Sequence, residues 1–215
     1  MALADLLDVF ASNEPVPGGG SAAALAGALG VSLLLMVAGL TKTRTGAPEE
    51  AADLAEAAAR LRPLRDTLAS LIDQDSDAYS AVIEAMRLPK DSDASRQQRR
   101  TAIEAATRKA IEVPMEIMRA CQQALRGASI IEHNGNPNAS TDTGTGVLLL
   151  MAGLRAAALN VNVNLNGVLD SAWIQRVTAE RDQLIADAEA DYRRGFGGAT
   201  PVSANASTMK DRSTG

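Results

Sequence analysis

Residues 21–40, SAAALAGALGVSLLLMVAGL, contain no charged side chain, and this stretch decides the fold. Twenty apolar residues are enough to cross a membrane as a helix. The first half consists mainly of Ala and Gly, however, whereas membrane insertion depends on Leu, Ile and Phe. Small residues favour a helix that is surrounded by other helices, so we expect a buried core helix and no membrane partner.

A second apolar segment occupies residues 140–165, where Asp142 and Arg155 are the only charged side chains. Its length and composition predict a core helix that packs against the first one. Helical spacing of apolar residues predicts further helices, and no stretch shows the alternating pattern of a strand. The predicted ranges are 2–12, 48–87 with a kink or break at Pro63, 95–132 with a bend near Pro114, and 171–194.

Capping residues mark several helix ends. Ser21 is expected to cap the first core helix, which should end between Lys42 and Gly46, and Ser95 with Gln98 resembles a capping box. Asp170 or Ser171 can cap the last helix. These elements predict an all-α fold, a single-domain helical bundle with long kinked helices over residues 1–194. Residues 195–215 are rich in Gly, Ser, Thr and Ala and predict a disordered tail.

The composition excludes several classes of function. The net charge is -5, the pI is near 5.0 and no long basic run occurs, so we expect no nucleic acid as a partner. Cys121 has no second cysteine to pair with and the amino terminus lacks a secretory signal, which favours a cytoplasmic protein. A zinc site needs three or four ligands, and the chain offers one cysteine and one histidine, His133, so no metal site is expected. His133 itself is expected near a helix end, with its ring either hydrogen-bonded within the protein or exposed to solvent.

Asp75 interrupts the apolar stripe of the helix predicted at 48–87. The stripe comprises Leu68, Leu71, Ile72, Asp75, Tyr79, Val82 and Met86. The opposite stripe is polar and is expected to be solvated; it comprises Asp66, Ser70, Asp73, Asp77, Ser80 and Glu84. A carboxylate on a buried face must be paired, protonated or used in a reaction. Asp75 is therefore the first catalytic candidate, and a structural Asp that bonds to a neighbouring helix is the alternative.

One face of the helix predicted at 140–165 combines small and polar residues. Its members are Asp142, Gly146, Leu149, Gly153, Ala156, Asn160, Asn164 and Gly167. Glycines at this spacing favour a close helix contact in which amides bond across the interface. Asn at positions 160, 162, 164 and 166 is unusual inside a helix, because Asn is a poor helix former. Four buried amides would need partners, and a flat heterocycle with many donors and acceptors would supply them.

The loop at residues 15–21, PVPGGGS, places backbone N–H groups ahead of a helix start, as anion-binding loops do. It lacks the Lys of a P-loop, and no strand precedes it as a dinucleotide site requires. The loop is weak evidence by itself, but it makes a set of candidate binding residues: Pro17, Gly18, Gly19, Gly20 and Ser21.

These segments occur in the order found in a known enzyme family. They are the loop Pro15 to Ser21; the helix with Asp73, Asp75 and Tyr79; Leu88-Pro89-Lys90; Val113-Pro114; Gly135-Asn136-Pro137-Asn138 with Asp142; and Ala158-Leu159-Asn160-Val161. The ordered set resembles the formimidoyltetrahydrofolate cyclodeaminase / methenyltetrahydrofolate cyclohydrolase family over roughly the first 170 residues. The resemblance implies an all-helical subunit that forms a homodimer, through its buried Ala/Gly-rich helices, and binds folate near the subunit contact.

Two positions depart from the family pattern. After Leu40 the family carries a Gly, several Lys and a Tyr, whereas this chain has Thr41 to Gly46, TKTRTG, in which Lys42 and Arg44 keep two charges. The Lys that precedes the family's Gly-Asn pair is Asn134 here. Both changes affect how a polyglutamate tail would be held.

The resemblance implies an enzyme that acts on a tetrahydrofolate derivative without a further cofactor. The expected reaction is hydrolysis of 5,10-methenyltetrahydrofolate to 10-formyltetrahydrofolate, because no formimino-transferase domain is attached. The alternative is a formimidoyltetrahydrofolate cyclodeaminase, which releases ammonia. Asp75 is expected to act as general base, while Lys90, Asp142 or an Asn amide orients the pterin or the leaving nitrogen. Further binding candidates are Lys42, Arg44, Tyr79, Asn136, Asn138, Asn160 and Asn164.

Two other classes of protein stay open at this point. A non-catalytic helical interaction protein fits an Ala-rich bundle, since such bundles arise from packing alone. A ferritin-like metal bundle is disfavoured, because no Glu-x-x-His pair occurs in the sequence.

Overall fold

The computed structural model describes residues 3–196, which form six α-helices and a short 3-10 helix and contain no strand. The helices are α1 (Leu3–Phe10), α2 (Gly19–Ala38), α3 (Pro48–Arg87), α4 (Asp93–Asn134), η1 (Pro137–Ala139), α5 (Ser140–Leu165) and α6 (Ser171–Phe196). The predicted all-α bundle is confirmed. Residues 195 and 196 belong to α6, not to the predicted tail, and residues 197–215 lie outside the described part of the chain.

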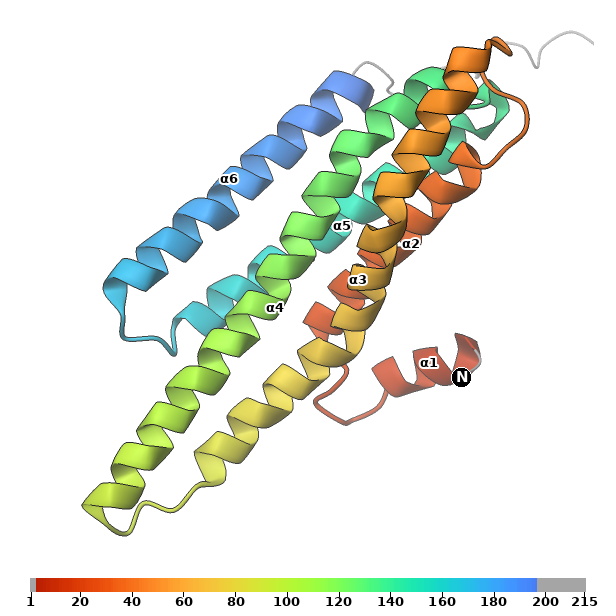
Figure 1. Cartoon of the computed structure of the whole chain (residues 1–215). Helices are drawn as coiled ribbons and strands as arrows, with labels where there is room; N and C mark the ends of the chain where they lie inside the picture. Colours follow the sequence, from red (N-terminus) through yellow and green to blue (C-terminus); the bar gives the residue numbers. More distant parts are fainter. Residues whose placement is uncertain (1–2, 197–215) are drawn as a thin grey trace, which may run out of the picture.

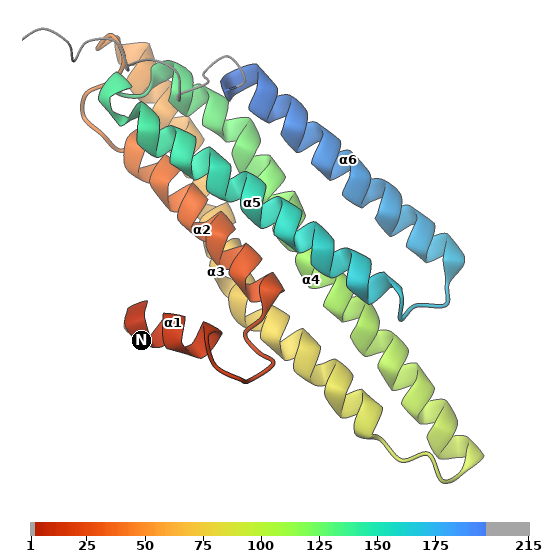
Figure 2. The same ribbon diagram turned by 180° about the vertical axis from the view of Figure 1, so that it is seen from behind.

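Four helices make the core of the bundle. α2 packs on α3 and α5, and α4 packs on the same two helices from the other side. α3 and α4 form a long hairpin that extends past the ends of α2 and α5 (Figure 1). α6 covers α4 and part of α5, whereas α1 stands beside the bundle and buries none of its residues (Figure 2).

Glycine allows the backbones of α2 and α5 to touch. A β-carbon at Gly146 would lie 2.9 Å from the Gly30 carbonyl oxygen, and one at Gly153 would lie 2.8 Å from the Ala23 carbonyl oxygen. Real β-carbons are essentially never found at such distances from another atom. The order of these contacts makes the two helices antiparallel and confirms the close helix contact predicted from the glycine spacing.

Cys121 of α4 fills the centre of the bundle. Its sulfur lies 2.8 Å from where a β-carbon of Gly27 would be, and burial raises the pKa of its thiol to about 12. Around it lie the largest fully buried side chains: Leu34, Leu54, Leu61, Leu68, Leu71, Ile111, Met115, Ile117, Met118, Ile131, Leu150 and Leu154. The core is therefore aliphatic, as the composition predicts.

Pro63 lies inside α3 and does not break it. Proline removes one helical hydrogen bond and crowds the preceding turn, which normally kinks or ends a helix. Here Pro63 is exposed, and Leu61 and Leu68 on either side of it are fully buried against the bundle. Because the turns on both sides of Pro63 pack against the bundle, the helix stays continuous. The predicted break at this position is therefore wrong. Pro114 is likewise inside α4.

Several predicted helix ends are wrong by a few residues. α2 begins at Gly19 with Gly18 as its N-cap, so Ser21 lies in the first turn and is not the cap. The same helix ends at Ala38, before the predicted range. The capping box of α4 pairs Ser92 with Ser95, not Ser95 with Gln98. Asp170 does cap α6, accepting a hydrogen bond from the Trp173 backbone N–H at 3.0 Å.

α2 and the segment Pro137–Leu165 are both long and apolar enough to cross a membrane, by length and composition alone. In each segment, half of the most apolar part is buried inside the bundle. The buried halves pack on each other and on α3 and α4, which identifies both helices as parts of the protein core.

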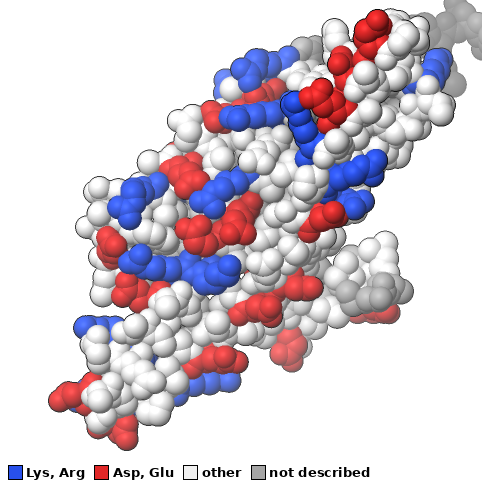
Figure 3. All heavy atoms as spheres, viewed as in Figure 1, with Lys and Arg blue, Asp and Glu red and all other residues white. Residues whose placement is uncertain are grey.

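The face formed by α4 and α6 is strongly charged, with acidic and basic side chains intermixed (Figure 3). Arg119 binds Glu180 at 2.6 Å and Arg108 binds Asp170 at 3.1 Å, so ion pairs hold α6 on α4. α2 carries no charged residue, and α5 carries two. The charged and uncharged surfaces of the bundle are therefore built by different helices.

Candidate functional site

Asp75 of α3 faces the first turn of α2. Its Oδ2 accepts hydrogen bonds from the Ser21 backbone N–H at 2.8 Å and from Ser21 Oγ at 3.1 Å. That N–H is one of the donors at a helix start that have no partner within their own helix. The carboxylate therefore caps α2 from a neighbouring helix, and its charge is favourable beside the positive end of the helix dipole. Asp75 thus makes the hydrogen bond to a neighbouring helix that a purely structural Asp would make. Its side chain is nevertheless half-exposed, as a catalytic group needs to be.

Burial raises the pKa of Asp75 above its ordinary value, and the hydrogen bonds from Ser21 oppose part of that shift. Ser21 Oγ also lies 2.9 Å from the Ile72 carbonyl oxygen, a second acceptor for its single proton, and 3.3 Å from Ser76 Oγ, so its position is fixed by three neighbours. A half-exposed carboxyl group with a raised pKa is suited to take up a proton during a reaction.

Gly20 is the residue that lets Asp75 come so close. A β-carbon at Gly20 would lie 2.0 Å from Asp75 Oδ1, which no side chain can accommodate without a shift of the carboxylate. The neighbouring glycines are under no such restriction, since a β-carbon at Gly18 would meet nothing nearer than 3.6 Å and one at Gly19 nothing nearer than 3.5 Å. Of the three consecutive glycines, the third, Gly20, is therefore the one that the close approach of Asp75 requires.

Asn160 of α5 reaches the same helix start. Its Nδ2 lies 3.5 Å from the place of a Gly19 β-carbon and donates to the Ala156 carbonyl oxygen at 3.0 Å. Gly19, Gly20, Ser21, Asp75 and Asn160 thus come from three helices and meet in one place, which we call the α2-start site. These five predicted residues are brought together by the fold.

Tyr79 lies one turn beyond Asp75 and is 42% exposed, so its predicted place in the core stripe is wrong, as is that of Met86. The reason is that α3 extends past the start of α2, and this part of it has no α2 to pack against (Figure 1). Instead Pro15 and Val16 of the preceding loop line a groove of about 240 Å³ with Tyr79. The predicted solvated stripe, from Asp66 to Glu84, is exposed throughout.

Asp142 lies at the other end of the bundle, half-buried in the first turn of α5. The adjoining turn holds Asn136, whose side chain accepts a hydrogen bond from the Asn138 backbone N–H at 3.0 Å. Lys42 is exposed in the loop after α2. We call Lys42, Asn136, Asn138 and Asp142 the α5-start group.

Arg44 has a structural task. Its guanidinium donates to the carbonyl oxygens of His133 and Glu132, the last turn of α4, while its own backbone N–H donates to the Asn134 carbonyl oxygen. Asn134 in turn donates to Asp53 at 2.9 Å. Two of the positions that depart from the family pattern therefore tie the α2–α3 loop and α3 to the end of α4. As predicted, His133 is exposed near a helix end.

Glu50 organises the rest of that loop. Its carboxylate accepts hydrogen bonds from Thr43 Oγ1 at 2.6 Å, from the Thr45 backbone N–H at 2.9 Å and from the Gly46 backbone N–H at 3.2 Å. These bonds, that from Thr43 foremost, lower the pKa of Glu50 to about 2. The segment TKTRTG thus forms a cap for α3, which explains why α2 ends before it.

The prediction of four buried amides is wrong. Asn162 and Asn166 are exposed, and Asn164 is half-buried and donates to the Ala110 carbonyl oxygen of α4 at 2.8 Å. α2 begins opposite Asn160, so the last turns of α5 have no second core helix beside them. Among the four, Asn160 is the amide that faces the α2-start site.

The separations within one chain are large. Asp142 and Asn160 are 18 residues apart on α5, about 27 Å at 1.5 Å per residue. α3 ends at Arg87, 12 residues or about 18 Å along the helix from Asp75, and Lys90 follows that end. It lines a separate groove of about 660 Å³ with Arg96 and Arg100. One chain therefore does not bring Asp75, Asp142 and Lys90 together.

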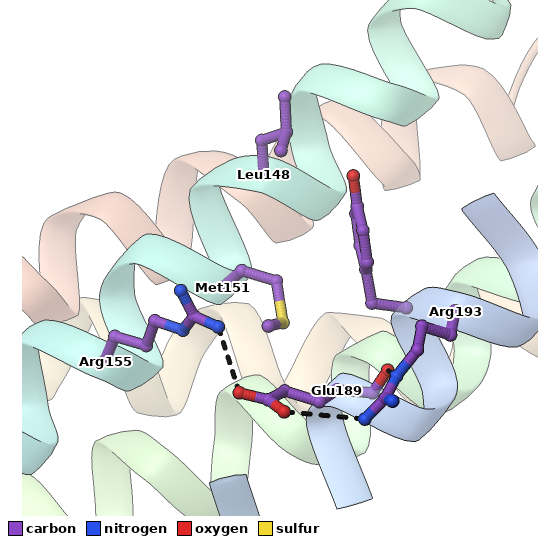
Figure 4. Close-up of a pocket in the computed structure, with 6 residues that line it drawn as sticks. Leu148, Met151, Arg155, Glu189 and Arg193 are labelled. Carbon is purple, nitrogen blue, oxygen red and sulfur yellow. Dashed lines mark hydrogen bonds and ion pairs between the residues drawn. The ribbon is translucent and has the colours of Figure 1, made fainter. Parts of the chain in front are cut away.

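A further groove of about 370 Å³ lies between α5 and α6 (Figure 4). Glu189 lies between Arg155 and Arg193 there, and Leu148 and Met151 form its apolar wall. On α5 its residues lie between Asp142 of the α5-start group and Asn160 of the α2-start site, and neither of these two residues lines it. Among residues 3–196 no three His, Cys, Asp or Glu side chains are grouped closely enough to hold a metal ion.

Comparison with known proteins gives a consistent result. The family model of formiminotransferase-cyclodeaminase matches residues 2–183. A methenyltetrahydrofolate cyclohydrolase from Methylorubrum extorquens is 40% identical over 184 residues, which cover 86% of this chain and 88% of the relative. A formimidoyltransferase-cyclodeaminase from Mus musculus is 30% identical over 125 residues, 58% of this chain but 23% of that larger protein.

The fold also has a counterpart among solved structures. The crystal structure of a formiminotetrahydrofolate cyclodeaminase from Thermotoga maritima superposes with a TM-score of 0.81 at 23% identity, covering 92% of this chain and 96% of the other. At that identity the likeness concerns the fold. The family match over most of the sequence, together with the 40% identical relative, shows that the chain belongs to the formiminotransferase-cyclodeaminase family.

Proposed function

We propose that this protein hydrolyses 5,10-methenyltetrahydrofolate to 10-formyltetrahydrofolate in the cytoplasm. The observation that carries the proposal is the 40% identity with a methenyltetrahydrofolate cyclohydrolase along nearly the whole of that protein. The half-exposed carboxyl group of Asp75 supplies the chemistry. Because the matching relatives are enzymes, a non-catalytic interaction protein is disfavoured.

The reaction needs a base close to a cationic carbon. Water forms a bond to the amidinium carbon of the substrate and gives one proton to Asp75, which leaves a neutral tetrahedral adduct. The bond from that carbon to N5 then breaks, the electron pair stays on N5, and N5 takes up a proton while the hydroxyl becomes the formyl carbonyl. A carboxylate in this position also stabilises the substrate's positive charge before attack.

The α2-start site prepares Asp75 for this role. Both hydrogen bonds from Ser21 go to Oδ2, and the described residues donate none to Oδ1. The carboxylate is thus fixed in orientation, and we assign the contact with water to Oδ1, which lies against Gly20. Asn160, beside Gly19, is placed to donate to a polar edge of the pterin.

The test follows the absorbance of 5,10-methenyltetrahydrofolate, corrected for spontaneous hydrolysis. Wild-type protein should accelerate its loss, and Asp75→Asn should lower the enzymatic rate about 10²- to 10⁴-fold, the range of a general base. Asp73→Asn is the matched control, because Asp73 lies on the same helix but on the solvated stripe. If Asp75→Asn kept the wild-type rate, the base would be another group, with Asp142 the next candidate.

A cyclodeaminase activity is the second candidate. It is favoured by the 30% identity with the mouse formimidoyltransferase-cyclodeaminase. In that reaction a folate nitrogen attacks the formimino carbon and ammonia leaves, so the tetrahedral carbon resembles that of the hydrolysis. Addition of 5-formiminotetrahydrofolate should then produce methenyl absorbance and ammonia. No change with either substrate would contradict both activities.

We also propose that a second copy of the chain covers the side of α2 and α5 that faces away from the bundle. Large apolar side chains are exposed there although the same helices bury their small ones. We call this surface the outer face; its residues are Leu29, Met36, Leu148, Ala152, Leu159 and Val163. Exposed apolar side chains gathered on one side mark a contact with another molecule. Arg155 lies at helical spacing among them and is paired with Glu189 of α6. The expected homodimer through the Ala/Gly-rich helices stays a prediction; because the small residues of α2 and α5 join these two helices within the subunit, the pairing proposed here uses the other side of the same helices.

The positions of the polar residues select one way of pairing. A two-fold axis in the plane of contact and perpendicular to the helices sets α2 antiparallel to α2 of the second copy. This places the α2-start site of one chain beside the α5-start group of the other. Asp75 of one chain and Asp142 of the other would then serve one site, whereas within one chain Asp142 is about 27 Å along α5 from Asn160 of the α2-start site.

The mass in solution tests the pairing directly. Light scattering should give twice the chain mass of 22.3 kDa, and Leu159→Glu on the outer face should shift the protein towards monomer. Leu169→Glu is the matched control, because Leu169 is also strongly exposed but follows the end of α5. A wild-type monomer would overturn the pairing and leave the assay of hydrolysis unaffected.

A further inference from the structure

Residues 3–196 cover the apolar face of α1 only in part. Leu3, Leu6, Leu7 and Phe10 share one side of the helix, yet no residue of α1 is buried, and Leu3 and Leu7 are 72% and 58% exposed. An isolated eight-residue helix is unstable in water, so its stability must come from packing. Residues 3–196 leave Leu3 and Leu7 uncovered, so a surface of another molecule can pack on them.

The connection to α2 sets where α1 lies. Pro15 and Val16 rest on α3 beside Tyr79, and the chain then turns into α2 at Gly18. Figure 2 shows α1 next to the start of α2, clear of the bundle behind it. α1 is thus held at the edge of the outer face, at the end where α2 begins.

We propose that α1 packs on a second copy of the chain, against the carboxyl end of that copy's α2. This inference rests on the antiparallel pairing proposed above, which places the end of the second α2 beside the start of the first. Met36 of the second copy is 42% exposed there and Leu40 is half-buried, so an apolar surface is available. Asp8 of α1 is exposed and Lys42 is exposed just beyond Leu40, so these charges are complementary as well.

Two other partners are distinguishable from this one. A membrane surface binds amphipathic helices, usually with the help of basic residues, which α1 does not have. A return of α1 onto its own α2 would bring it near Ala22, not near Met36, because Gly19 and Met36 are about 26 Å apart along the helix. Each alternative therefore predicts a different cross-link or binding result.

Paired cysteines provide the test, since the natural Cys121 is fully buried. Leu7→Cys with Met36→Cys should give a covalent dimer on mild oxidation, seen on a non-reducing gel. Each single variant, and the pair Leu7→Cys with Ala22→Cys, should give none. An internal bond in the Leu7–Ala22 pair would instead place α1 on its own subunit and overturn the proposal.

Affinity gives the second arm of the test. Leu7→Ser should raise the dimer dissociation constant about tenfold or more, because it removes apolar contact area. Val9→Ser is the matched control, since Val9 is exposed on α1 but lies off the apolar face, and it should stay within about twofold.

The outcomes separate this inference from the proposed pairing. If the wild-type protein has the mass of a dimer but the Leu7→Cys, Met36→Cys variant forms no cross-link, the role of α1 is overturned and the pairing is left intact. A monomer would overturn both. Co-sedimentation of the wild-type protein with phosphatidylcholine/phosphatidylglycerol vesicles, lost in Leu7→Ser, would assign α1 to a membrane instead. Hydrolysis of 5,10-methenyltetrahydrofolate is scored separately in each case.

Discussion

At the scale of single residues, Gly20 and Gly19 should respond very differently to the same substitution. Gly20→Ala forces its new methyl group into Asp75, so we expect a loss of about 1–3 kcal/mol in unfolding free energy and a large fall in turnover. Gly19→Ala meets no atom nearer than 3.5 Å and should stay within about 1 kcal/mol of wild type. Chemical denaturation and the absorbance assay check both. Equal effects of the two substitutions would contradict the close approach.

Asp75 should cost the protein stability when it is ionised. The folded state holds its proton more tightly than the unfolded chain does, because burial raises the pKa from its ordinary 3.8. The free energy of unfolding should therefore fall as pH rises from below 3.8 through the raised pKa. Asp75→Asn lacks this term, so it should be at least as stable as wild type at about pH 7, and its advantage should vanish in acid.

Melting temperatures of both proteins across that pH range are the measurement. A less stable Asn variant at neutral pH would mean that capping of α2 by the charged carboxylate outweighs its desolvation. The activity of the wild type should fall on acidification at a higher pH than an ordinary aspartate predicts, since the base must be ionised to accept a proton.

Asp75 could be found from the sequence because a carboxylate interrupts an apolar stripe. The role of Gly20 could not, since it depends on an approach between residues that are distant in the chain. The same holds for Arg44. Its charge suggested that it binds the substrate, but its guanidinium donates hydrogen bonds to the carbonyl groups at the end of α4.

At the scale of helices, the cap of α3 should make stability depend on acid. The pKa of Glu50 is lowered from 4.5 to about 2, so its bonds contribute stability that is present above about pH 4.5 and is lost as pH falls towards 2. Glu50→Gln should lower the melting temperature at neutral pH, and the difference from wild type should shrink over that interval. Glu49→Gln, on the neighbouring exposed position, is the control.

Helix interiors were predictable from composition, whereas helix ends depended on contacts between elements. α5 has the predicted bounds, 140 to 165, because its sequence has only two charged residues and turn residues flank it on both sides. α2 begins and ends earlier than predicted, since a carboxylate from α3 caps its start and the loop after it folds onto Glu50. α3 continues through Pro63 because buried leucines on both sides hold it.

At the scale of the whole molecule, the proposed pairing predicts that two inactive variants restore each other. Asp75→Asn and Asp142→Asn chains, mixed after dissociation, form mixed dimers in about half of the molecules. Each mixed dimer has one site with both carboxylates intact and one site with neither. About a quarter of the wild-type rate should therefore return, if Asp142 acts in the site as predicted.

The control mixes Asp75→Asn with Asp75→Asn, Asp142→Asn double-variant chains, where no intact site can form. Recovery in the first mixture but not in the second would locate the two residues on different chains of one site. No recovery in either, with dimers present, would mean that each subunit works alone.

The cap that Asp75 places on α2 also concerns the timing of synthesis. The two ends of that hydrogen bond are 54 residues apart, so a ribosome has made all of α2 and more than two thirds of α3 before the bond can exist. Until then the most apolar helix of the protein is a nascent segment without its cap. Chaperone demand should therefore be greatest in that interval, and a ribosome stalled before codon 75 should leave a chain that is captured far more readily than one stalled after α4.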